Sequence, residues 1–350
     1  MFKRIIVPLD GSSRAEQALP VAARIARASG GSLHLLQVIS PVVDYGGLTP
    51  VPMLTEQSTM AEMAQSTGYL TSFATLPMME GIQITTEAVF GAPARQILEV
   101  AGSRGTNLIV LCSHGRSGFT RWALGSVAHQ LVHHSSIPML VLREHEVNSL
   151  LSHGDDAQTL RTIVPLDGSE LAESALWPAA YLTSALAAPA QGALHLVQVV
   201  KIFPATAEEG FISELNEEAL QRARAYLMTT MEHIHATMKD LKLFVTSSVE
   251  YERDVTSTLV NVAEQKSEGQ GVENAGSCNL IAISTHGRNG LQRLIMGSVT
   301  DRLLSTTKGP MLIVRPPKVG KLLNEEKHTM KQKNDNPELA YAGSSWVGLL

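Results

Sequence analysis

Two glycine-containing segments of this 350-residue chain carry residue types that could bind a phosphate group. In the first, nine residues separate Gly115 from a Gly-Ser-Val sequence that begins at Gly125. The second repeats this spacing between Gly287 and Gly297. Glycine lets a backbone approach a phosphate closely, and a Gly-Ser pair that opens a helix offers unpaired N–H groups and a partial positive charge. Each segment is therefore expected to bind an anion at a helix N-terminus.

An aspartate could form the other wall of each site. Asp10 and Asp167 stand in the same sequence, Ile-Val-Pro-Leu-Asp-Gly-Ser, after an apolar run. A carboxylate there could accept from a ribose hydroxyl or an adenine amino group. It could also organise a turn or cap the next helix, because Asp-Gly-Ser is a common turn sequence. Two identical placements, each accompanied by a glycine loop, favour ligand contact.

Each side chain beside the loop glycines could have one of two roles. His114 and His286 precede those glycines, and a structural hydrogen bond to the loop is favoured over a role as catalytic base. Arg116 and Arg288 follow them, and could reach phosphates or stay solvated. The chain has neither a P-loop nor a Gly-x-Gly-x-x-Gly fingerprint, so no catalytic residue is assigned.

A pair of histidines is the one arrangement with metal-ligand spacing. His129 and His133 lie four residues apart, on one face of a predicted helix. No carboxylate or cysteine accompanies them in the sequence, and zinc sites need at least three protein ligands. No metal site is therefore expected.

The elements that must position these residues occur twice. Four sequence blocks recur in the same order, and the offset between copies grows from 157 residues (Ile6 to Ile163) to 172 (Pro138 to Pro310). Most of that growth is an insertion, 265–277, whose Gly, Glu, Asn and Ser content is typical of a surface loop. The chain is therefore a duplication of one domain.

Each copy alternates short apolar runs with helical patterns. Continuous apolar runs indicate strands that are buried on both faces of a parallel sheet. In the first copy strands are predicted at 5–9, 33–39, 82–89, 108–112 and 139–142, and helices at 15–28, 56–75, 94–103 and 127–134. Pro20 and Pro178 fall inside the first helix of each copy and are expected to kink it or delay its start.

This alternation predicts an α/β fold of two doubly wound five-stranded parallel-sheet domains in tandem. The domains are placed at 1–145 and 160–317, and the polar tail 318–350 is predicted to be disordered. In such sheets ligands bind beyond the carboxyl ends of the strands, where the strand order reverses. The aspartates and the glycine loops belong to that edge.

Charge and hydropathy limit the partners. The chain has 28 Lys and Arg against 33 Asp and Glu, a formal net charge of -5, which argues against nucleic acid. No apolar stretch approaches the roughly 20 residues that span a bilayer. Two cysteines in unlike contexts fit a reducing compartment. A cytoplasmic protein without a membrane partner is expected.

These motifs resemble those of the universal stress protein family over nearly the whole chain, except the linker, insertion and tail. That family binds ATP through Gly-x-x-Gly, nine residues, and then Gly-Ser or Gly-Thr. The chain departs from the pattern at the first glycine, which is Cys112 in one copy and Ser284 in the other. Both replacements are small, so the resemblance implies weakened nucleotide binding.

The resemblance also implies Rossmann-like domains of the adenine-nucleotide-binding type, which hold ATP or a related nucleotide with or without Mg²⁺. Asp10 and Asp167 would contact the adenosine, and the ends of the second strands would meet the adenine. The candidate nucleotide-binding residues are Asp10, Val38, Cys112, Gly115, Arg116, Gly125, Ser126 and Val127 in the first copy, and Asp167, Val199, Ser284, Gly287, Arg288, Gly297, Ser298 and Val299 in the second.

The favoured function is a stress-response regulatory protein that binds an adenine nucleotide in one or both copies and is not an enzyme. A nucleotide-independent interaction scaffold is the first alternative, and a weak ATPase is less favoured. The last strands, 139–142 and 311–314, are apolar sheet edges that invite pairing. In the family such strands pair between domains, so an intrachain pseudo-dimer is expected, with further homo-oligomers left open.

Overall fold

The computed structural model describes eleven stretches of the chain, and residues Met1–Arg315 make up one compact unit. The described residues are 1–40, 43–44, 51–52, 56–113, 124–144, 147–151, 159–201, 209–252, 254–264, 279–285 and 296–316. The predicted surface loop at 265–277 and the predicted disordered tail at 318–350 lie outside them.

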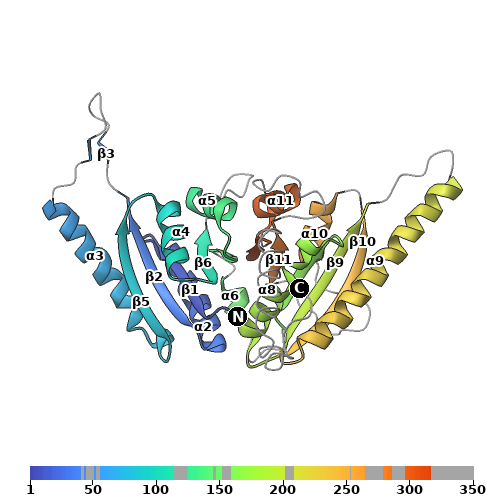
Figure 1. Ribbon diagram of the computed structural model, residues 1–350, viewed down its shortest axis with the longest axis horizontal. Coiled ribbons are helices and arrows are strands. Elements are labelled where there is room, and N and C mark those ends of the chain that lie inside the picture. The colour runs from blue at the N-terminus through green and yellow to red at the C-terminus, as the bar shows by residue number, and fades with distance from the viewer. Residues whose placement is uncertain are drawn as a thin grey trace, which may run out of the picture. The chain divides into compact units, whose positions relative to one another are not determined.

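Strands and helices alternate through both halves of this unit (Figure 1). The first half contains β1 (Arg4–Leu9), α1 (Ser13–Glu16), α2 (Ala18–Ser29), β2 (Ser32–Ile39), β3 (Val43–Asp44), β4 (Val51–Pro52), α3 (Glu56–Ala74), the 3-10 helix η1 (Pro77–Met79), β5 (Gln83–Phe90), α4 (Pro93–Ser103), β6 (Leu108–Ser113), α5 (Ser126–His134), β7 (Met139–Arg143) and α6 (Val147–Leu151). The second half contains β8 (Arg161–Leu166), α7 (Glu170–Glu173), α8 (Leu176–Ala187), β9 (Gly192–Val200), α9 (Glu209–Thr237), β10 (Leu243–Tyr251), α10 (Val255–Glu264), β11 (Leu280–Ser284), α11 (Ser298–Thr306) and β12 (Met311–Val314).

The strands predicted for the first copy are confirmed to within one residue at either end. The first helix is present but interrupted, because α1 ends at Glu16 and α2 begins at Ala18. Pro20 lies in the first turn of α2 and Pro178 in the first turn of α8, where the missing N–H is tolerated. As expected, the prolines delay the start of the long helix in each half.

The main sheet has ten strands in the order β10-β9-β8-β11-β12-β7-β6-β1-β2-β5. Neighbouring strands within each half are parallel, which confirms the doubly wound α/β fold. The strand order reverses between β1 and β6 in the first half and between β8 and β11 in the second. These two switch points are where doubly wound sheets bind ligands.

Two hydrophobic cores cover the two faces of the sheet. One core is built with residues of α2, α3, α8 and α9, and the other with residues of α4, α5, α10 and α11. Successive strand residues alternate between them, as Ile5 and Ile6 do. Strands buried on both faces explain the continuous apolar runs of the sequence.

The two halves meet at β7 and β12, which pair antiparallel. Leu140 lies opposite Leu312, and both side chains are fully buried. Arg143 of β7 donates from Nη2 to the carbonyl oxygen of Leu304 in α11, at 2.6 Å. None of the described helices is both long enough and apolar enough to cross a membrane.

Candidate functional site

The carboxylate of Asp10 organises the turn that leaves β1. Its Oδ1 accepts from the backbone N–H of Ser12 at 3.0 Å and from the Ser12 hydroxyl at 2.6 Å. The Ser12 Oγ in turn accepts from Ala15 N–H at 3.2 Å and caps α1. Gly11 between them has a φ of 82°, a conformation that favours glycine. The exposed Asp10 side chain is thereby held at the carboxyl end of β1.

The second half builds the same turn at the end of β8. Ser169 donates to Oδ1 of Asp167 from its N–H at 3.0 Å and from its hydroxyl at 2.6 Å. Ser169 also caps α7, and Gly168 has a φ of 80°. The turn role considered for these aspartates is thus filled by Oδ1. A role in ligand contact is compatible with the turn, because a carboxylate can accept several hydrogen bonds.

A tyrosine that the sequence analysis missed lies beside each turn. Tyr69 of α3 donates its hydroxyl to Glu16 at 3.0 Å, and Tyr226 of α9 donates to Glu173 at 2.8 Å. Burial and the carboxylate partner raise the pKa of both phenols. Each pair is separated by 53 residues, so a search of the duplication for recurring polar pairs could have found them.

The glycines at the other wall, Gly125 and Gly297, are the N-cap residues of α5 and α11. Gly125 donates its N–H to the Ser113 hydroxyl at 3.1 Å, and Gly297 donates to the Thr285 carbonyl oxygen at 2.8 Å. Neither helix start receives a side-chain cap. A Cβ added to Gly297 would lie 3.2 Å from that carbonyl oxygen, so close approach to Thr285 explains the glycine. The first-turn N–H groups of both helices are therefore suited to an anion.

The residues that replace the first loop glycine are the penultimate residue of β6, Cys112, and the last residue of β11, Ser284. Cys112 is half-buried and packs against the α2 and α8 core, whereas the next residue, Ser113, meets Gly125. Burial, followed by the Glu144 charge, raises the pKa of the Cys112 thiol to about 11, so the thiol stays protonated. Ser284 is buried and accepts from the Ser174 hydroxyl at 3.4 Å. The Cys112 side chain thus points away from the start of α5.

The valines of the two predicted sites all pack on the same side of the sheet. Val38 and Val127 in the first half, and Val199 and Val299 in the second, are partly buried against the core that contains α4, α5, α10 and α11. Ser126 and Ser298, the first residues of α5 and α11, are exposed. The strand end and the helix start of each predicted site therefore share this face.

Other members of the predicted site lie outside the described residues. They are Gly115, Arg116, Gly287 and Arg288, together with the neighbouring His114 and His286.

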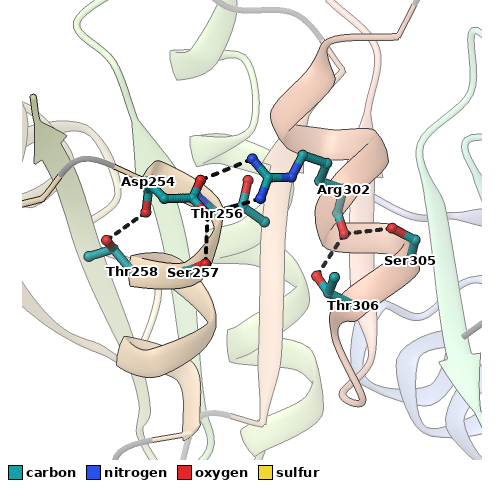
Figure 2. Close-up of polar contacts among 7 residues, drawn as sticks. All are labelled: Asp254, Thr256, Ser257, Thr258, Arg302, Ser305 and Thr306. Carbon is teal, nitrogen blue, oxygen red and sulfur yellow. Dashed lines mark hydrogen bonds and ion pairs between the residues drawn. The ribbon is translucent and has the colours of Figure 1, made fainter. Parts of the chain in front are cut away.

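A charged pair fixes the start of α10 to α11 (Figure 2). Both oxygens of Asp254 accept from the Arg302 guanidinium, at 3.0 and 2.9 Å. Ser257 donates its hydroxyl to Asp254 at 2.6 Å. The Ser257 hydrogen bond and then Arg302 lower the pKa of Asp254 to about 2. In the first half Gln130 occupies the position of Arg302, since each is the fifth residue of its helix, so only α11 has this pair.

The prediction that no carboxylate accompanies the histidine pair of α5 is wrong. Asp301 of α11 lies beside His129 and His133, and possible ligand atoms of the three residues are all within 4.8 Å of one another. The prediction failed because Asp301 is far away in the sequence and is brought to α5 by the pairing of the halves.

The chain is similar to universal stress proteins along most of its length. The model of the universal stress protein family matches residues 1–143 and 159–315. A universal stress protein of Mycolicibacterium smegmatis is 26% identical over 319 residues, which cover 89% of this chain and 97% of the relative. Universal stress protein YxiE of Bacillus subtilis is 31% identical over 148 residues, 41% of this chain and 100% of the relative.

A solved structure shares the fold of both halves. The crystal structure of a universal stress protein from Archaeoglobus fulgidus matches with a TM-score of 0.60 at 18% sequence identity. The match covers 90% of this chain and 99% of that chain, so the tandem arrangement of α/β domains is shared as a whole.

Proposed function

The chain belongs to the universal stress protein family, as two family domains in tandem, and from this premise we propose that it is a regulatory protein that binds ATP or a related adenine nucleotide. One or both halves would hold the ligand, at the switch points beside β1 and β8. Binding, rather than turnover, is the proposed activity, and no catalytic residue is assigned.

The observation that carries this proposal is the repeated pairing of a fixed carboxylate with an uncapped helix start. The turn of Asp10 has the same hydrogen-bond lengths as the turn of Asp167. In both halves a glycine is the N-cap residue of the helix across the switch point, so the helix start has no side-chain cap. Two copies that keep this arrangement argue for a shared ligand rather than for turn chemistry alone.

The two walls suit opposite ends of a nucleotide. The aspartate carboxylate would accept from the ribose hydroxyls or the adenine amino group. The first-turn N–H groups of α5 and α11 would receive the phosphates, with the helix dipole favouring negative charge. Mg²⁺ could accompany the phosphates, because it usually binds through substrate phosphates rather than through a protein cage.

We also propose that the two halves act as one intrachain pseudo-dimer. The antiparallel pairing of β7 with β12 and the hydrogen bond from Arg143 to Leu304 support it. Such an assembly would let occupancy of either half influence a surface formed by both.

Calorimetric titration with ATP tests the binding proposal, with and without Mg²⁺. The variants are Asp10→Asn, Asp167→Asn and the double variant, because an amide oxygen can still accept from the turn serine. Loss of a hydrogen bond to a charged group should weaken binding at that site by about tenfold to a hundredfold. The exposed Asp240 lies outside both sites, so Asp240→Asn is the matched control.

Two results would overturn the proposal. One is the absence of both binding heat and a thermal shift at millimolar nucleotide, which would leave the interaction scaffold as the better account. The other is binding that the double variant leaves unchanged, because the ligand would then sit elsewhere.

A further inference from the structure

Three side chains with metal-binding atoms converge between α5 and α11. Figure 1 shows these two helices side by side. His129 and His133 come from α5, and their ring centroids are 4.4 Å apart. Asp301 comes from α11 and completes a set whose possible ligand atoms lie within 4.8 Å of one another. Two imidazoles and one carboxylate are the protein ligands of several catalytic zinc sites.

The set arises because the two copies have diverged at two positions of the same helix. His129 is the fourth residue of α5, and Asp301 is the fourth residue of α11. The eighth residue is His133 in α5 and Ser305 in α11. Equivalent positions of the duplication therefore meet, and they supply imidazoles from one half and a carboxylate from the other.

One of the three residues has an unmet hydrogen-bonding need. The Nε2 atom of His133 is buried and has no hydrogen-bond partner among the described residues. Buried polar atoms are almost always paired, because an unpaired one has lost its bond to water. His129 and Asp301 are exposed, so an ion could reach the site from solvent.

We propose that His129, His133 and Asp301 bind a divalent transition-metal ion, with Zn²⁺ as the best match to this ligand set. Imidazole suits Zn²⁺, Cu²⁺ and Ni²⁺, and the carboxylate adds the charge that Zn²⁺ accepts. Water would fill the fourth position. The ion would join the two halves, and this inference does not depend on nucleotide binding.

To bind the ion, the three side chains must move slightly closer together. Bonds of about 2.0–2.1 Å in a tetrahedral site place ligand atoms about 3.3 Å apart. The exposed side chains of His129 and Asp301 can rotate to close the remaining gap. Arg315 and His134 lie near enough to act electrostatically on His133 and oppose a cation, whereas the Asp301 carboxylate favours one.

Zinc titration of the full chain, freed of metal with a chelator and without nucleotide, tests this site. A competing chromophoric chelator reports the affinity of the wild type and of His129→Gln, His133→Gln and Asp301→Asn. We expect one Zn²⁺ per chain and affinities weaker by about tenfold or more in each variant. His134→Gln is the control, because His134 adjoins the site on α5 but is not in the set.

Two further measurements separate the site from a surface histidine pair and from misfolding. Co²⁺ in place of Zn²⁺ should give the intense visible absorption of four-coordinate cobalt in the wild type and lose it in Asp301→Asn. Zn²⁺ should raise the melting temperature of the wild type but not of Asp301→Asn, whose exposed position should leave folding intact. Wild-type zinc affinity in Asp301→Asn, or no binding of stoichiometric Zn²⁺ by the wild type, would overturn the proposal.

Discussion

Both ring nitrogens of His195 form hydrogen bonds with hydroxyl groups of the neighbouring strand, β10. Its Nδ1 lies 2.7 Å from the Thr246 hydroxyl and its Nε2 lies 3.1 Å from the Ser248 hydroxyl. Burial, followed by the charge of Arg161, lowers its pKa to about 4. His34 repeats the first of these contacts with Thr85, at 2.8 Å. The imidazole of His195 is therefore a neutral structural group that joins β9 to β10.

This environment predicts a dependence of stability on pH. In the unfolded chain His195 titrates near its ordinary pKa of about 6.5, so it takes up a proton before the folded chain does. Neutral His195 therefore contributes to the free energy of unfolding in full above about pH 6.5. This contribution, up to about 3 kcal/mol, is lost as the pH falls toward 4. Urea unfolding between pH 7 and pH 4.5 measures this loss, which His195→Gln should reduce.

The exposed His235 provides the control, because His235→Gln should keep the wild-type pH dependence. An unchanged pH dependence in His195→Gln would show that this histidine is not the group whose burial matters.

Cys112 is predicted to react slowly. With a pKa of about 11, its thiolate is scarcer at pH 7.5 than that of an ordinary cysteine, by on the order of a hundredfold. Alkylation by iodoacetamide, in a Cys278→Ser background that leaves a single thiol, should be slower in the folded protein than in urea by a similar factor. Equal rates would contradict the raised pKa and the burial of the Cys112 thiol.

At the scale of elements, the strands could be predicted from the sequence, whereas the contacts between helices could not. Strands buried on both faces leave continuous apolar runs, and the duplication showed that the site elements recur. The Asp254–Arg302 pair spans 48 residues and joins two helices, and no local pattern marks it. The same is true of Asp301 beside His129, because that contact exists only after the two halves have paired.

The start of α11 allows a sharp test of why a glycine stands there. Gly297→Ala would place a Cβ 3.2 Å from the Thr285 carbonyl oxygen, so the helix start or this carbonyl must give by a few tenths of an ångström. We expect a loss of about 1–3 kcal/mol in the free energy of unfolding, together with weaker nucleotide binding in the second half. Gly309 has open space at its Cβ position, so Gly309→Ala should change stability by less than about 0.5 kcal/mol. Equal effects of the two variants would contradict the close-approach argument.

At the scale of the whole molecule, one sheet runs through both halves of the described unit. Its central contact places Leu140 opposite Leu312, with no exposed surface on either side chain. A buried unpaired charge at this contact should cost several kcal/mol. Leu140→Lys or Leu312→Lys should therefore lower the melting temperature and increase the radius of gyration measured by X-ray scattering.

Leu215 of α9 is an exposed leucine, so Leu215→Lys controls for the added charge and should leave both quantities unchanged. If Leu140→Lys keeps the wild-type compactness and melting temperature, the pairing of β7 with β12 does not hold the halves together.

The measurement that tests the central claim most directly is the identity of any small molecule that leaves the protein on unfolding. The protein would be purified gently without added nucleotide, denatured, and the released molecules identified by mass spectrometry. The account predicts ATP or another adenine nucleotide from the wild type, less of it from Asp10→Asn or Asp167→Asn, and least from the double variant. An empty wild-type protein that also shows no thermal shift with millimolar nucleotide would contradict the account.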